Sequence, residues 1–124
     1  METIDGTMTA RHTYGQGVLD ELGPLHRQLR RAIPEVYKSF TEFHHASFVA
    51  GALDVKTKEL IALGISVIER CDGCIASHAE GAARAGATRQ QAAEAIGVSL
   101  LMGGGPSSIY GPRAYAAFCE FTDN

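Results

Sequence analysis

The stretch CDGCIASHAEG, residues 71–81, holds two of the chain's three cysteines and a histidine four positions after the second. Gly86 lies a few residues further on and can end a helix in the left-handed conformation, so we expect a helix from about residue 71 to 85. With about 100° of rotation per residue, Cys71, Cys74 and His78 share one stripe near the start of that helix. The stretch therefore predicts a helix that gathers sulfur and imidazole groups at its N-terminal end.

Apolar residues recur at spacings of three and four through most of the chain, which is the helical pattern. Clean alternation of apolar and polar residues, which would indicate strands, is scarce. Asp54 is a candidate N-cap, Thr88 and Gln91 form a variant of the capping box, and Gly23-Pro24 should interrupt or restart the first helix. The expected fold is all-α, a bundle of five to six helices, with the other helices over residues 18–32, 34–50, 55–69, 88–102 and 106–121.

A chain of 124 residues, of which 45% are hydrophobic, fits one domain. We expect a flexible N-terminal segment over residues 1–17 and a single domain over residues 18–124. The formal net charge is −3 and the basic residues form no run beyond Arg30-Arg31, which argues against a nucleic-acid partner. No signal peptide and no apolar run of about 18 residues is evident, so we expect no membrane partner and a cytoplasmic location.

Structural disulfides are rare in the cytoplasm, so a close cysteine pair there indicates redox or metal chemistry. The N–H groups and dipole at a helix start stabilise a thiolate, and an imidazole one turn away can take the thiol proton. Zinc is the competing interpretation, but the sequence lacks a second ligand pair, so we expect no metal. In a third interpretation both cysteines are small core residues and His78 is solvated. Cys119 has an apolar helical setting and is expected to be buried and inert.

Glu59 begins the apolar run ELIALGISVIE, in a helix that is apolar almost all round and should be central and buried. A carboxylate is costly to bury in such a helix without a partner. Glu59 either belongs to a polar first turn or faces the thiols and acts in proton transfer, and the pattern leaves both open. His44 and His45 lie among aromatic residues on the second helix and point about 100° apart, so at most one can line the thiol site.

Glu59, the pair Cys71-x-x-Cys74 and His78 together resemble the core motif of the AhpD-like branch of the carboxymuconolactone decarboxylase family. The surrounding sequence agrees, with LDVKTKELIALGISV before the motif and MGGGPSSIYGPRA near the end of the chain. The resemblance covers about residues 35–120. It implies an all-α fold built into homo-oligomers, either trimers or hexamers, with no cofactor.

Members of that branch reduce hydroperoxides with the cysteine pair, and a dithiol on a lipoamide-type adaptor or a thioredoxin-like protein reduces them again. Carried over to this chain, Cys74 would attack the peroxide and Cys71 would resolve it, while Glu59 and His78 move the protons. Cys71, closer to the helix end, is expected to be the more exposed sulfur, so the residues by themselves leave open which sulfur attacks first. The position before the second cysteine, a histidine in the peroxidase that gives the branch its name, is Gly73 here. The resemblance therefore implies a shorter relay or a weaker peroxidase.

Two alternative functions remain open. The decarboxylases that give the family its name act on a lactone ring without a thiol pair, and such a lyase would need cations to hold carboxylates. Arg70, Arg84 and Arg113 are candidates, but each is more simply interpreted as a surface arginine. The other alternative is a non-catalytic oligomeric module whose dithiol senses oxidants.

Overall fold

The computed structural model describes residues 13–122, which form six helices and no strand. The predicted all-α fold of five to six helices is confirmed. Residues 1–12 of the predicted flexible segment lie outside the described residues, and the first helix begins at Gln16, slightly before the predicted start. No helix within residues 13–122 has the length and apolar character that crossing a membrane requires. The helices are α1 (Gln16–Ala32), α2 (Pro34–Phe48), α3 (Val55–Ile68), α4 (Asp72–Arg84), α5 (Arg89–Gly103) and α6 (Gly105–Glu120).

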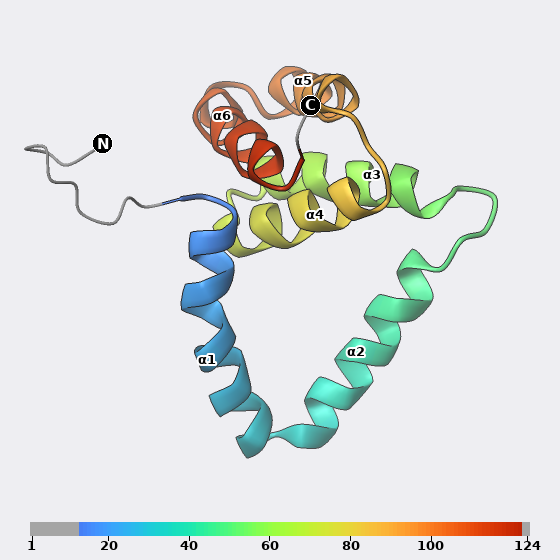
Figure 1. The fold of residues 1–124 in the computed structure, drawn as a ribbon, viewed down its shortest axis with the longest axis vertical. Coiled ribbons are helices and arrows are strands. Elements are labelled where there is room, and N and C mark those ends of the chain that lie inside the picture. Colours follow the sequence, from blue (N-terminus) through green and yellow to red (C-terminus); the bar gives the residue numbers. More distant parts are fainter. Residues whose placement is uncertain (1–12, 123–124) are drawn as a thin grey trace, which may run out of the picture.

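Helices α3 to α6 form the body of the molecule, and α1 and α2 leave it as a V-shaped arm (Figure 1). In the body, α3 packs on α4 and α5, and α6 packs on α5 and α4. Helix α1 contacts the body chiefly through α4, whereas α2 makes few contacts with the rest of the chain and has no buried residue. Lys58 of α3 ties the end of α2 to the body, because its Nζ donates to the carbonyls of Ser47, at 3.1 Å, and Val49, at 2.8 Å.

Small side chains allow the body helices to approach closely. Ala76, Ala79 and Ala82 of α4 are fully buried, and so are two alanines of α6. The core that they form with larger side chains joins α3, α4, α5 and α6. Because protein interiors are packed as densely as crystals, such a core fixes the distance between α3 and α4. The largest apolar side chains in it with no exposed surface are Phe118, Leu63, Ile75 and Val67.

The helix over residues 55–69 is central, as predicted, because it packs on α4, α5 and α6, but it is buried on one face only. Leu63 and Val67 of α3 are fully buried, but Ile61 and Ile65 are 48% and 54% exposed. The exposed face of α3 and the neighbouring face of α5 line an apolar groove of about 340 Å³, to which Val98 contributes from α5. The apolar pattern of α3 therefore combines two faces, one toward the core and one toward this groove.

The predicted caps of α3 and α5 are confirmed. The Asp54 side chain accepts from the backbone N–H of Thr57 at 2.8 Å, and hydrogen bonds from Thr57 hold the pKa of Asp54 below its usual value. Thr88 and Gln91 form both halves of the capping box. The predicted break at Gly23-Pro24 is wrong, because α1 continues through Pro24. A proline removes only one helical hydrogen bond, and the exposed carbonyl left without a partner can be solvated by water.

Left-handed residues end α3 and α4. After α4, Gly86 has φ 95°, as predicted, and the N–H of Ala87 donates to the carbonyl of Ala82. After α3 the same position is held by Arg70, with φ 56°, and the N–H of Cys71 donates to the carbonyl of Ser66. A side chain in this conformation costs about 1–2 kcal/mol relative to the right-handed form. The turn that delivers Cys71 to α4 is therefore strained in a way that the turn after α4 is not.

We predict opposite effects on stability at these two turns. Gly86→Ala should lower the free energy of unfolding by about 1 kcal/mol, because a Cβ would be added in the left-handed conformation with open space around it. Arg70→Gly should raise the free energy of unfolding by about 0.5–1 kcal/mol, because it removes that strain at some entropic cost. Urea denaturation measures both changes. Effects of the same sign would contradict this account of the turns.

Candidate active site

The two motif cysteines form a disulfide at the N-terminus of α4. Their Cα atoms are 5.2 Å apart, and the disulfide joins Cys71 Sγ to Cys74 Sγ. Cys71 is the N-cap of α4, and its sulfur accepts from the backbone N–H of Cys74 at 3.1 Å. The predicted position of the pair at the helix start is thus confirmed. A sulfur that accepts an N–H of the first turn is in the place where a helix stabilises an anion.

The two cysteine residues differ in their exposure to solvent. Cys74 is exposed, whereas Cys71 is only partly exposed, so the prediction that Cys71 is the more exposed residue is wrong. As the N-cap, Cys71 follows directly on the tight turn after α3, and its N–H donates to the carbonyl of Ser66. Leu22 of α1 packs over the next turn, and a Cβ on Gly73 would lie 2.8 Å from its Cδ1. Glycine at this position lets the arm approach, and a larger side chain there would displace Leu22.

Glu59 does not merely belong to a polar first turn, because its carboxylate faces α4. Its Oε1 lies 2.8 Å from Nδ1 of His78, and the two side chains are only 13% and 16% exposed. Gly81 follows His78 by three residues on α4, and a Cβ there would lie 2.5 Å from the carboxyl carbon of Glu59. The absence of a side chain at residue 81 therefore makes room for the carboxylate.

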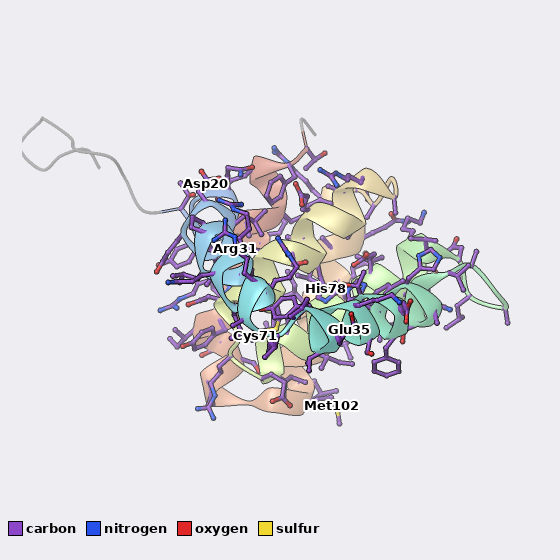
Figure 2. The ribbon with its side chains drawn as sticks, turned by 90° about the horizontal axis from the view of Figure 1, so that it is seen from below. Asp20, Arg31, Glu35, Cys71, His78 and Met102 are labelled. Carbon is purple, nitrogen blue, oxygen red and sulfur yellow. A yellow bond between two sulfur atoms is a disulfide. The ribbon has the colours of Figure 1, made fainter. Side chains whose placement is uncertain are left out.

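The hydrogen bond from His78 to Glu59 sets the chemistry of the imidazole. A carboxylate accepts, so Nδ1 of His78 donates to it, and Nε2 of the neutral ring is left able to take a proton. His78 follows Cys74 by four residues on α4, so the two side chains are neighbours on one face of the helix. The arrangement can thus move a proton between a thiol of the pair and solvent or a bound molecule. Figure 2 looks at this end of the molecule, with Cys71 and His78 lying behind the arm formed by α1 and α2.

Helix α2 contributes His44 to the site but not His45. The ring of His44 stacks on that of His78 with centroids 6.0 Å apart, and Phe48 stacks on the same imidazole at 5.3 Å. Phe48 was not predicted as a site residue, although its spacing of four from His44 places both rings on one face of α2. The rings of His44 and Phe48 are themselves stacked at 4.8 Å. One of the two predicted histidines therefore lines the site.

Arg113 and Asp72 form a second charged pair beside the cysteines. Nη1 of Arg113 on α6 lies 3.1 and 3.3 Å from the two carboxylate oxygens of Asp72, and its guanidinium lies over the rings of Tyr14 and Tyr110. The interpretation of Arg113 as a simple surface arginine is wrong. Loss of solvent opposes its charge, but the hydrogen bond and charge of Asp72 raise the pKa of Arg113 above its ordinary value. No sequence pattern links two residues 41 positions apart, so this pair could not be predicted.

The sulfur atoms have no metal-ligand set around them. Among residues 13–122 there is no group of three or more His, Cys, Asp or Glu side chains that could hold a metal ion. Glu59 and His78 are instead engaged with each other. Cys119, predicted to be buried, is only partly buried on α6 and is a free thiol.

We predict that Gly81→Ala disrupts the pairing of Glu59 with His78, because the added methyl group would occupy the space of the carboxylate. Gly97→Ala is the matched control, since this glycine also lies inside a helix but a Cβ there would meet nothing within 4 Å. The control should be stabilised by about 0.5–1 kcal/mol from helix propensity, whereas Gly81→Ala should be destabilised. Thermal unfolding compares them, and nuclear magnetic resonance of the His78 ring reports the lost hydrogen bond. Stabilisation of both variants to the same extent would contradict the proposed close approach.

Two solved structures with the same fold are described as carboxymuconolactone decarboxylase family proteins. A carboxymuconolactone decarboxylase family protein from Legionella pneumophila is 37% identical, with a TM-score of 0.82 over 86% of this chain and 95% of that chain. A protein of the same family from Thermotoga maritima, described with a suggested role in an antioxidative response, is 30% identical, with a TM-score of 0.73 over 85% of this chain and 89% of that chain.

Sequence comparisons agree with the structural ones. An uncharacterized protein of Cupriavidus necator is 36% identical over 100 residues, which make up 81% of this chain and 88% of that protein. An uncharacterized protein encoded in the cox locus of Paracoccus denitrificans is 37% identical over 90 residues, 73% of this chain and 81% of that protein. Residues 34–120, which include the whole of the site on α3 and α4, match the carboxymuconolactone decarboxylase family. The chain therefore belongs to the carboxymuconolactone decarboxylase family.

Proposed function

We propose that the protein is a cytoplasmic, thiol-dependent hydroperoxide reductase of the AhpD-like branch. The observation that carries the proposal is a disulfide-bonded cysteine pair at a helix N-terminus, with the paired carboxylate and imidazole of Glu59 and His78 beside it. This combination supplies a stabilised thiolate and a proton carrier in one place. The antioxidative role suggested for the Thermotoga maritima relative fits the same chemistry.

The reaction begins from the reduced pair. The thiolate of Cys74, the more exposed of the two cysteines, attacks one oxygen of the hydroperoxide, the O–O bond breaks, and a sulfenic acid and an alcohol are formed. The sulfur of Cys71 then attacks that of Cys74, the disulfide forms, and the sulfenic oxygen leaves as water. A dithiol on a lipoamide-type adaptor or a thioredoxin-like protein returns two electrons and two protons, which restores both thiols.

The pair of Glu59 and His78 carries the protons in this scheme. His78 takes the proton of the attacking thiol at Nε2, while Glu59 stabilises the imidazolium that results, and the same proton goes to the departing oxygen. General acid–base help of this kind is worth about 10²–10⁴ in rate. Because Gly73 stands where a second histidine could be, His78 is the only imidazole in this relay. His44, stacked on His78, limits how the ring turns.

The structure favours the peroxidase over a lactone decarboxylase. Arg113 is committed to Asp72, and Arg84 pairs with Glu80 at 3.1 Å. The guanidinium of Arg113 is therefore not free to hold the carboxylates of a lactone acid. Arg84 is 76% exposed in a surface pair that holds it only weakly, and Arg70 is exposed as well, so Arg113 and the presence of the thiol pair are what disfavour the lyase. An oxidant sensor would use the same cysteines but would stop after one equivalent of peroxide, and the turnover experiment below separates it from an enzyme.

We propose further that the protein works as a homo-oligomer, a trimer or a hexamer. Phe40 and Phe43 of α2 are 62% and 69% exposed, and Ile65 and Met102, which line the α3–α5 groove, are 54% and 71% exposed. A 15-residue helix without buried residues gains little stability in water by itself. Apolar surface on this scale is typical of a face that another subunit covers.

Peroxide consumption tests the activity, with dihydrolipoamide and thioredoxin as alternative electron donors. The wild type should turn over many equivalents, Cys74→Ser should lose activity entirely, and Glu59→Gln should lose about 10²-fold or more because the relay is broken. Cys119→Ser is the matched control and should keep the wild-type rate, because this thiol lies outside the site. Turnover by Cys74→Ser at the wild-type rate would refute the assignment, and a single equivalent consumed by the wild type would identify a sensor.

Light scattering during gel filtration tests the assembly. The wild type should have the mass of three or six chains, and Phe43→Glu should shift it to smaller species because a charge is costly to bury in an apolar interface. Thr41→Glu is the control, because it adds the same charge to another exposed face of α2 and should leave the mass unchanged. A monomeric wild type would contradict the proposed assembly.

A further inference from the structure

Asp72 places a negative charge inside the cysteine motif. It is the first residue of α4, directly after the N-cap Cys71 and two positions before Cys74. A carboxylate suits the positive end of a helix, but reduction of the disulfide creates a thiolate at the same end. Two anions that compete for one helix terminus destabilise each other. Left alone, Asp72 would therefore favour the disulfide over the reduced pair.

Arg113, on another helix, forms an ion pair with Asp72. It lies on α6, and its Nη1 is 3.1 and 3.3 Å from the two carboxylate oxygens of Asp72. The rings of Tyr110, at 4.5 Å, and Tyr14, at 5.1 Å, hold the guanidinium in place through cation–π contacts. The side chains of Arg113 and Asp72 are only 30% and 40% exposed. A guanidinium fixed in this way is part of the electrostatic environment of the cysteines rather than a mobile surface charge.

We propose that Arg113 is a positioning residue that neutralises Asp72 and thereby stabilises the thiolate of the reduced Cys71–Cys74 pair. The inference rests on the proposed redox role of this pair. In the affected step, a dithiol donor passes two electrons to the disulfide, the S–S bond breaks, the donor becomes a disulfide, and one sulfur of the pair remains as a thiolate. Arg113 touches neither the donor nor the sulfur atoms in this account, and it acts through its charge, which offsets that of Asp72 at the thiolate.

Other charged groups near the motif are exposed or have partners of their own, and Arg70, directly before Cys71, is exposed to solvent, which screens its charge. Glu59 and His78 form their own pair across the α3–α4 contact, and Glu120 at the end of α6 accepts from the backbone N–H groups of Gly15 and Gln16. At an effective dielectric constant of about 40–80, a unit charge about 6 Å from a thiolate shifts the thiol pKa by about 0.5–1 unit. Such a shift is large enough to measure.

The test is a charge cycle in the Cys119→Ser background, so that only the two motif thiols respond. Arg113→Met should raise the pKa of the more acidic thiol by about 0.5–1 unit, because the negative charge of Asp72 is left unopposed. Asp72→Asn should lower that pKa, because the positive charge of Arg113 is left unopposed. The double variant should return close to the starting value, and Arg113→Lys, which keeps the charge, should stay near it. Thiolate absorbance of the reduced protein against pH provides the readout.

The redox equilibrium with glutathione provides a second readout. Arg113→Met should shift it toward the disulfide by about threefold to tenfold, and Asp72→Asn should shift it toward the reduced pair. A merely structural role for the ion pair would move both single variants in the same direction or leave the thiols unchanged, and either result would overturn the inference. If Arg113→Met fails to fold, the direction of the thiol pKa change in Asp72→Asn still decides the question. Neither readout needs peroxide turnover, so a failure of the proposed activity would be seen separately.

Discussion

The close packing of α3 on α4 is the constraint on which the site depends. Fully buried alanines on α4 allow the approach, and Gly81 leaves the space that the carboxylate of Glu59 occupies. The left-handed turn at Arg70 joins the two helices so tightly that Cys71 becomes the N-cap of α4. Backbone geometry thus places a carboxylate, an imidazole and two sulfur atoms together. No mobile loop is needed to assemble them, which suits groups that must be held precisely for proton transfer.

Helix α2 connects this site to the surface of the molecule. One of its faces stacks His44 and Phe48 on His78, while other faces leave Phe40 and Phe43 exposed. Since α2 makes few contacts within its own chain, its position depends on that ring stack, on the bonds from Lys58 and, in our proposal, on a neighbouring subunit. Assembly would then stabilise the aromatic wall of the site as well as bury apolar surface.

Much of the fold could be predicted because its signals are local. Helix periodicity, the caps at Asp54 and Thr88 and the left-handed Gly86 each depend on residues within a few positions of one another. The stripe of Cys71, Cys74 and His78 followed from helical geometry in the same way. A proline, by contrast, favours a break without requiring one, and α1 tolerates Pro24.

The rest of the site depends on contacts between helices, which a single sequence does not encode in its spacing. The choice between a polar first turn and a buried pair for Glu59 required knowing that α4 lies opposite it. The ion pair of Asp72 with Arg113 joins α4 to α6 and has no local signal. The prediction that α3 is buried throughout failed for a related reason. In the sequence, apolar residues that face a groove cannot be told from apolar residues that face the core.

The central claim is that Cys71 and Cys74 pass together between dithiol and disulfide when a hydroperoxide is reduced. The most direct measurement mixes reduced protein carrying Cys119→Ser with one equivalent of a hydroperoxide and follows its mass and thiol content. The account predicts that both thiols disappear together, the protein loses two hydrogen atoms and gains no oxygen, and one alcohol forms per chain. Two thiols that remain open to alkylation after the peroxide is added, or an oxygen retained on Cys74 without a disulfide, would contradict it.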